Sequence, residues 1–79
     1  MGKKVIEVDL ERIHPNLRLI FHSESIEWMC RLIQSCGQIQ PIEVWLEGEG
    51  FRIWDGEKRW RACKILGISR VKALLVEFN

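Results

Sequence analysis

The stretch WDGEKRWRACKILG, residues 54–67, brings together residue types that bind anions. Gly56 lies between an apolar run and a segment with the composition of a helix, and Lys58 and Arg59 follow within one helical turn. The first N–H groups of a helix have no intrahelical partners and lie at its positive end, so a phosphate is a natural ligand there. A glycine lets such a ligand approach the backbone closely. This stretch therefore predicts a phosphate site at the start of a helix.

The same residues also fit an ordinary solvated helix. Asp55 would then cap the helix, Gly56 would form the turn before it, and the cations would make its solvated face. Two cations in the first turn oppose the helix dipole at a cost of roughly a few tenths of a kcal/mol, which a bound anion would offset. The spacing alone favours the plain capped helix, and it matches neither of the glycine-rich motifs G-x-x-x-x-G-K-[ST] and G-x-G-x-x-G.

The composition is that of one globular domain. The 79 residues leave no room for a second core, and 47% of them are hydrophobic and 29% charged. No stretch approaches the roughly 20 apolar residues that a membrane-spanning helix needs. The N-terminus also lacks the apolar region of a secretory signal. We therefore expect a single domain over residues 1–79, located in the cytoplasm and without a membrane partner.

The charges are unevenly distributed, although the net charge is only +1. Residues 52–72 carry seven Lys and Arg against Asp55 and Glu57, a balance of +5, and the remainder has a balance of −4. A basic end of this kind can meet phosphates. The chain as a whole lacks the basicity that is typical of a stand-alone DNA-binding domain.

The three cysteines do not form a metal-binding pattern. Cys30, Cys36 and Cys63 contain no C-x-x-C pair, and His14 and His22 add no ligand spacing. We expect reduced, buried thiols and no metal-binding residues.

The first half of the chain predicts a strand, a loop and a helix. An alternating pattern of apolar residues begins a strand within 3–13, and prolyl and asparaginyl residues predict a loop over 14–18. The clearest helix covers 23–37, with Ser23 or Ser25 as its cap and Gly37 as its C-terminal turn. Its predicted buried face consists of Ile26, Met29, Cys30, Ile33 and Cys36.

The second half predicts two hairpin strands, a second helix and a final strand. In order, these are a strand over 41–46, a turn over 47–50, a strand over 51–54, a helix over 56–66 and a strand over 70–78. The order β-α-β-β-α-β predicts a small α+β domain with a mixed sheet and two or more helices.

Three segments resemble motifs of the ParB partition-protein family. GEKRWRACKILG (56–67) is similar to the family's box G-E-R-R-x-R-A-A-x-x-A-G. SIEWMCRLIQSCGQIQPIEVW (25–45) resembles a helix that ends in G-x-x-Q-P-I-x-V, and VIEVDLERIHPNLR (5–18) resembles a shortened form of I-x-P-N-x-x-x-x-R. The match spans about residues 5–77, in the family's order. The chain therefore resembles a ParB-like N-terminal domain, whose wider fold is shared with sulfiredoxin.

This resemblance implies a nucleotide site. In partition proteins of the family the nucleotide is CTP with a magnesium ion, and its hydrolysis accompanies clamp closure on DNA. The resemblance implies that the base and ribose are lined by Gly37, Gln40 and Pro41. The phosphates would be surrounded by Gly56, Glu57, Lys58 and Arg59, and Arg18 ends the opening motif of the same site. For slow nucleotide hydrolysis, an activity that stays open, the candidate catalytic residue is Glu57.

The sequence departs from the family pattern at several positions. Lys58 stands where the box has its first arginine, so a point charge replaces a bidentate fork. Asp55 replaces an alanine, and we favour a helix cap over a magnesium ligand for it. Glu57 occupies the position of sulfiredoxin's reactive cysteine, which argues against that activity. The family's third motif, E-N-x-Q-R, does not occur in the 79 residues. The chain is then expected to be an excised domain or a small relative that does not clamp DNA.

Other residues are weighed for the same site. The four tryptophans are expected mainly in the core, with Trp54 and Trp60 as the exceptions that stack on a ligand. His14 and Arg18 could reach the site from the first loop, and a solvent-facing loop fits them equally well.

Three functions are compatible with the sequence. The first is nucleotide binding in a chromosome or plasmid partition protein or a related DNA-associated protein. The second is a DNA-backbone-binding or nuclease-like module, with DNA reached here or through a separate domain. The third is a small-molecule kinase of the same fold, with Glu57 or Asp55 as its base. A homodimer is compatible with these functions.

Overall fold

The computed structural model describes residues 3–16, 23–38 and 40–77. Within these ranges it contains a five-stranded sheet in the order β1-β5-β3-β4-β2 and two α-helices. The strands are β1 (Lys3–Asp9), β2 (Ile13–His14), β3 (Ile42–Glu47), β4 (Gly50–Asp55) and β5 (Arg70–Val76), and the helices are α1 (Ser23–Cys36) and α2 (Glu57–Ile65). This arrangement confirms the predicted α+β class with a mixed sheet.

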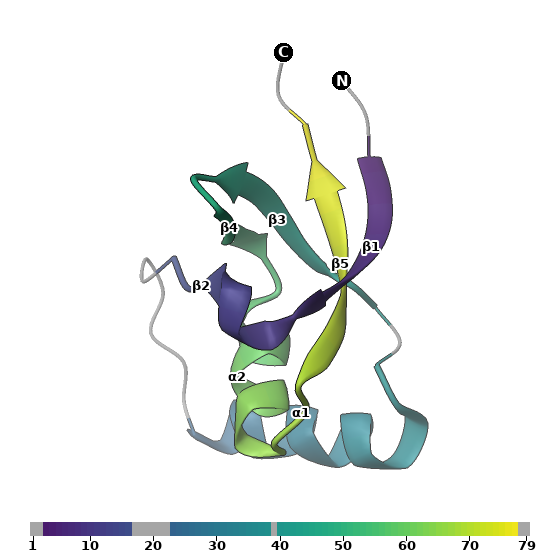
Figure 1. The fold of residues 1–79 in the computed structure, drawn as a ribbon. Coiled ribbons are helices and arrows are strands. Elements are labelled where there is room, and N and C mark those ends of the chain that lie inside the picture. Colours follow the sequence, from purple (N-terminus) through teal and green to yellow (C-terminus); the bar gives the residue numbers. More distant parts are fainter. Residues whose placement is uncertain (1–2, 17–22, 39, 78–79) are drawn as a thin grey trace.

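The last strand of the chain lies inside the sheet. β5 pairs antiparallel with β1 and parallel with β3, and β3 pairs antiparallel with β4. The two-residue β2 pairs parallel with β4 at the other edge. Figure 1 shows both helices at one end of the sheet, with the start of β1 and the end of β5 side by side at the opposite end.

The segment 3–13, within which the sequence predicts a strand, contains a strand and then a turn. After β1 the chain forms a 3-10 turn, η1 (Leu10–Arg12), and then enters β2 at the far edge of the sheet. Leu10 turns into the core with 8% of its surface exposed, and its N–H donates to the carbonyl of Ser69 at 2.8 Å. The strand that the sequence predicts within 3–13 is confirmed as β1, and the turn after it was not predicted because it is fixed by a residue far away in the sequence.

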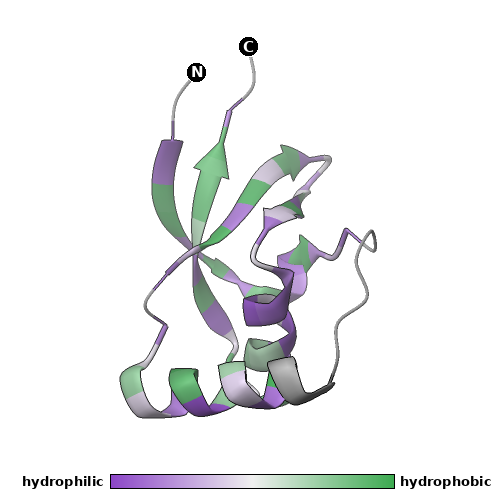
Figure 2. Cartoon of the chain, turned by 180° about the vertical axis from the view of Figure 1, so that it is seen from behind, coloured by the Kyte–Doolittle hydropathy of each residue, from purple (hydrophilic) through white to green (hydrophobic). Residues whose placement is uncertain are grey.

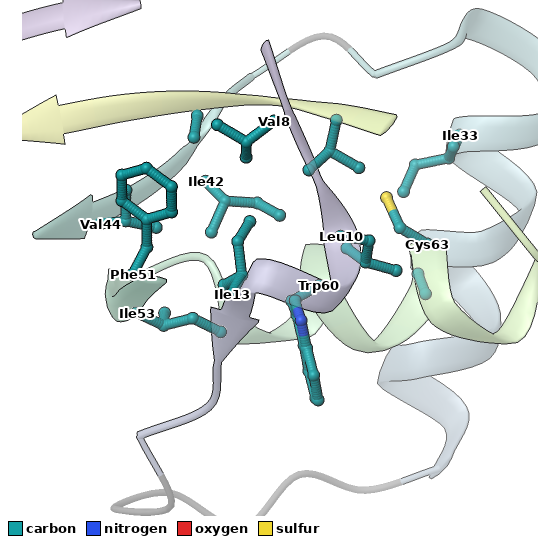
Figure 3. Close-up of a cluster of buried hydrophobic side chains, with 13 residues drawn as sticks. Val8, Leu10, Ile13, Ile33, Ile42, Val44, Phe51, Ile53, Trp60 and Cys63 are labelled. Carbon is teal, nitrogen blue, oxygen red and sulfur yellow. The ribbon is translucent and has the colours of Figure 1, made fainter. Parts of the chain in front are cut away.

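One apolar cluster joins one face of the sheet to the two helices. Figure 3 shows side chains of the strands, of η1 and of both helices meeting in this cluster. The strands alternate between hydrophobic and hydrophilic residues (Figure 2), as expected of a sheet with one buried face. The large side chains of the cluster that are fully buried are Ile13, Ile42, Val44, Ile53, Cys63 and Val71.

α1 forms an outer layer that packs on α2. Gly37 ends it in a left-handed conformation, with φ 76°, and donates its N–H to Ile33 O at 2.7 Å, which confirms the predicted C-terminal turn. Ile33 is buried, whereas Cys36 is exposed, so the predicted buried face is shorter than expected. Trp28 also lies on the outer side with 65% of its surface exposed, against the prediction of a core position.

The hairpin between β3 and β4 carries a bulge at its open end. Its turn includes Gly48, with φ 61°, as the sequence predicts. Val44 pairs with Ile53 and Glu43 pairs with Asp55, so Trp54 is an extra residue on β4. A bulge bends its strand and re-aims the residues that follow. Here it directs the end of β4 towards the start of α2.

The two ends of β3 provide a matched test of the core. Ile42 is fully buried, and Leu46 on the same strand has 62% of its surface exposed. We expect Ile42→Ala to lower the free energy of unfolding by about 2–4 kcal/mol because it leaves a cavity. Leu46→Ala should change it by less than about 0.5 kcal/mol. Urea denaturation followed by tryptophan fluorescence measures both, and equal losses would contradict the described core.

Candidate functional site

α2 begins immediately after β4, and the junction is a single residue. Gly56 has φ 103° and ψ 25°, a left-handed conformation that favours glycine. Its carbonyl accepts the N–H of Trp60 at 3.0 Å, the first hydrogen bond of the helix. A Cβ at position 56 would lie 3.0 Å from Arg59 Nη1 and 3.3 Å from Ile42 Cα. Backbone conformation and close packing therefore both require glycine here.

Asp55 does not cap α2. The N-cap residue is Gly56, and Asp55 Oδ1 accepts the N–H of Gly56 at 2.9 Å instead of an N–H of the first helical turn. The preferred cap prediction is wrong because the left-handed glycine begins the helix one residue later. The exposed carboxylate of Asp55 instead fixes the peptide that enters the junction.

Arg59 connects the start of α2 to the segment before β3. Its Nη2 donates a hydrogen bond to Gln40 Oε1, and its Nη1 lies over Gly56. Gln40 and Arg59 line a pocket of 210 Å³ between the end of α1 and the start of α2. Three apolar side chains of α1 form the opposite wall: Met29, Leu32 and Ile33. The pocket thus combines an apolar wall with a cationic rim, a pairing found at small-molecule sites.

The structure brings part of the predicted site together. Gly37, Gln40 and Arg59 line the pocket, and Gly56 lies beneath Arg59. Two separate motifs of the sequence, the segment over 37–42 and the box that starts at 56, therefore share one pocket.

The other predicted residues have different positions. Pro41 and Lys58 are half-buried beside lining residues but are not part of the lining of this pocket. Arg18 lies outside the described residues. His14 is placed beside Gly50, where a Cβ on that glycine would lie 3.3 Å from His14 Nε2, and it does not line the pocket.

Glu57 faces away from the pocket. It has 6% of its surface exposed, and its Oε1 accepts the N–H of Asn16 at 2.9 Å. Its Oε2 lies 3.6 Å from Arg61 Nη2 in an i,i+4 ion pair. The observed contacts make this carboxylate an anchor for the loop after β2, and its predicted catalytic role stays a prediction.

Arg52 holds the same loop and was not predicted. Its Nη1 donates to the carbonyl of Pro15 at 2.9 Å, while Nε and Nη2 donate to Glu47 Oε1 at 3.1 and 2.7 Å. The hydrogen bonds between Arg52 and Glu47 lower the pKa of the Glu47 carboxyl and raise the pKa of Arg52. No local sequence pattern marks this role, because Pro15 and Arg52 lie on different elements.

The tryptophans and the larger groove lie away from this pocket. Trp60 is a core residue with 8% of its surface exposed, so the prediction that it is an exception was wrong. Trp54 is 44% exposed, as predicted, and packs edge-to-face on Trp45 with ring centroids 5.9 Å apart. A groove of 1080 Å³ runs between α1 and α2. Trp60 lines it, and the described residues that are predicted to bind the base, ribose and phosphates do not.

The thiols are free and differ in burial. Cys63 is buried, Cys30 is half-buried and Cys36 is exposed, so the predicted burial holds for the first and fails for the last. Burial, and then the neighbouring Cys30, raise the pKa of the Cys63 thiol. Among the residues that the structure describes, no group of three or more His, Cys, Asp or Glu could hold a metal ion.

Comparisons with known proteins identify the family of the chain. The sequence matches the family described as the ParB N-terminal domain over residues 1–79. The chain belongs to this family. A nucleoid occlusion protein of Oceanobacillus iheyensis is 40% identical over 77 residues, which cover 91% of this chain but only 27% of that relative. The ParB domain therefore matches about a quarter of this longer protein.

Solved structures confirm the fold. The C-terminally truncated chromosome-partitioning protein ParB from Caulobacter crescentus, complexed with CTP-γ-S, has a TM-score of 0.85 and 28% identity, covering 96% of this chain and 46% of that one. The same protein has been solved complexed to the centromeric parS site. Sulfiredoxin from Arabidopsis thaliana has a TM-score of 0.83 at 19% identity, covering 95% of this chain and 86% of its own, which shows the shared fold alone. No helix of the described ranges is long and apolar enough to cross a membrane.

Gly56 and Gly48 provide a matched pair for the junction. Both have positive φ, but a Cβ at position 48 would meet no atom within 4 Å. Gly48→Ala should therefore cost only the backbone strain, of order 1–3 kcal/mol. We expect Gly56→Ala to cost more, because its Cβ must also displace Arg59 or β3. Chemical denaturation of both variants measures the difference, and an equal loss would show that the close contacts at Gly56 do not matter.

Proposed function

We propose that this ParB-like domain binds a nucleoside triphosphate, CTP or a similar nucleotide, in the pocket between α1 and α2. The observation that carries the proposal is the contact between Arg59 and Gln40 above Gly56, which joins two sequence motifs in one pocket. Further support comes from the ParB of Caulobacter crescentus, a structural neighbour complexed with CTP-γ-S.

The pocket fits one part of such a ligand. Its volume of 210 Å³ is smaller than the roughly 300–1,000 Å³ of sites that enclose a drug-sized molecule, so the phosphates would extend beyond it. We assign the base and ribose to the side of Gly37, Gln40 and the neighbouring Pro41. The phosphates would then meet the N-terminus of α2, where backbone N–H groups and the guanidinium of Arg59 favour anions.

Magnesium would reach this site with the nucleotide. The two acids that flank Gly56 are already engaged, Asp55 with the N–H of Gly56 and Glu57 with Asn16 and Arg61. Mg²⁺ is commonly held by substrate phosphates and water with one or two carboxylates. We therefore propose phosphates and water as its main ligands. Any hydrolysis by Glu57 would require a water molecule to reach a carboxylate that now faces Asn16.

DNA is the second partner that we propose, for the longer protein of which such domains are a part. The ParB of Caulobacter crescentus was solved complexed to the centromeric parS site, and the present domain covers 41% of the chain in that structure. On this domain the segment 52–72 carries a net charge of +5. A role in chromosome partition follows from this proposal, and the nuclease and kinase alternatives stay predictions.

A panel of nucleotides tests the proposed function. We expect CTP with magnesium, at millimolar concentration, to raise the melting temperature of the domain, because a ligand that binds only the folded state stabilises it. ATP, GTP and ADP in the same assay give the selectivity. No stabilisation by any of the four nucleotides would refute nucleotide binding by this domain.

Arg59→Ala tests the phosphate contact. Hydrogen bonds to charged groups contribute about 1.5–3 kcal/mol, so affinity should fall by roughly 10–150-fold in isothermal titration calorimetry. Lys64→Ala is the matched control, since it also removes a cation from α2. The ammonium of Lys64 lies over Trp60, 5.0 Å from the ring centroid. The control should keep its affinity. Equal losses in the two variants would mean that only general positive charge matters.

A further inference from the structure

The segment before β3 has a gap in its pairing with β5. β3 and β5 are parallel, and their pairing begins with Ile42 opposite Ala73. One residue earlier, the same register would place Pro41 opposite Lys72. In a parallel pair a residue bonds to the residues on either side of the one opposite it. The N–H of Lys72 lies just before the first pair of this ladder and therefore needs an acceptor from another part of the chain.

Gln38 supplies that partner with its side chain. Its Oε1 accepts the N–H of Lys72 at 2.8 Å, and its Nε2 donates to the carbonyl of Lys72 at 2.9 Å. A primary amide offers a donor and an acceptor, as a peptide group does, so it can replace a strand residue. We call this pair of hydrogen bonds the Gln38 clasp. It adds hydrogen bonds to β5 at Lys72, one residue before the first pair with β3.

The clasp is connected to the candidate site. Gln38 Nε2 also lies 3.2 Å from the carbonyl of Gln40, and the side chain of Gln40 accepts a hydrogen bond from Arg59. A continuous series of hydrogen bonds thus runs from Lys72 in β5, through Gln38 and Gln40, to the first turn of α2. Gln38, Gln40 and Arg59 all line the 210 Å³ pocket.

We infer that Gln38 is a positioning residue of the nucleotide site, an inference that rests on the proposed function. Its bonds to Lys72 and to the carbonyl of Gln40 hold both glutamines near β5, so that Gln40 meets Arg59 before a ligand arrives. Side chains that are positioned in advance avoid an entropy cost when the ligand binds. The motif G-x-x-Q-P-I fixes no residue at this position, so the motif alone does not predict the clasp.

Gln38→Met removes the three hydrogen bonds of the side chain, two to Lys72 and one to the carbonyl of Gln40, and keeps its length. We expect the affinity for CTP with magnesium to fall about tenfold in calorimetry, well below the melting temperature of the variant, which corresponds to about 1.4 kcal/mol. Gln34→Met is the matched control, because Gln34 is an exposed glutamine of α1 that lines the other groove. The control should bind as the unmodified domain does.

Hydrogen exchange of the Lys72 amide tests the clasp without a ligand. In Gln38→Met this amide loses its acceptor, so we expect its exchange to accelerate about tenfold or more, with neighbouring amides of β5 unchanged. Faster exchange together with unchanged nucleotide affinity would overturn the positioning role and leave the proposed function intact. If the unmodified domain binds no nucleotide, both proposals fall. Unchanged exchange at Lys72 would show that the clasp is absent and would also overturn the inference.

Discussion

β4 ends at Asp55 and α2 begins at Glu57, so the chain changes direction within the single residue Gly56. Its left-handed backbone and its missing side chain leave the space in which Arg59 and Ile42 approach each other. The first turn of the helix can therefore lie directly on the start of β3. The candidate pocket depends on this approach, because Arg59 would otherwise not reach Gln40.

The first turn of α2 joins two connections of the chain. Glu57 faces inwards and holds Asn16, in the segment that follows β2. Arg59, two residues later, faces outwards and holds Gln40, in the segment that precedes β3. Positions that differ by two residues are separated by a little over half a helical turn, which explains why these two charges serve opposite sides. A short rigid element thus fixes two connections that are far apart in the sequence.

Local patterns in the sequence predicted the helices and the left-handed turns, but not the contacts between distant residues. Each helix begins and ends within one residue of its predicted bounds, because hydrophobic spacing and glycine are local signals. The break at Leu10 depends on Ser69, and no local pattern contains that contact. Asp55 resembled a cap because the sequence does not show that Gly56 begins the helix. Gln38 was missed for the same reason, because its partner Lys72 lies 34 residues away in the sequence.

The position of β5 in the sheet has a consequence for the order of folding. β5 is the last strand in the sequence, yet it links β1 to β3, and its pairings with both span long stretches of chain. Non-local pairings of this kind slow folding, because a large loop must close before they form. During synthesis, β1 and the β3–β4 hairpin stay unjoined until residues 70–76 have left the ribosome. The candidate pocket, in which Gln38 is bonded to Lys72 of β5, would be one of the last features to form.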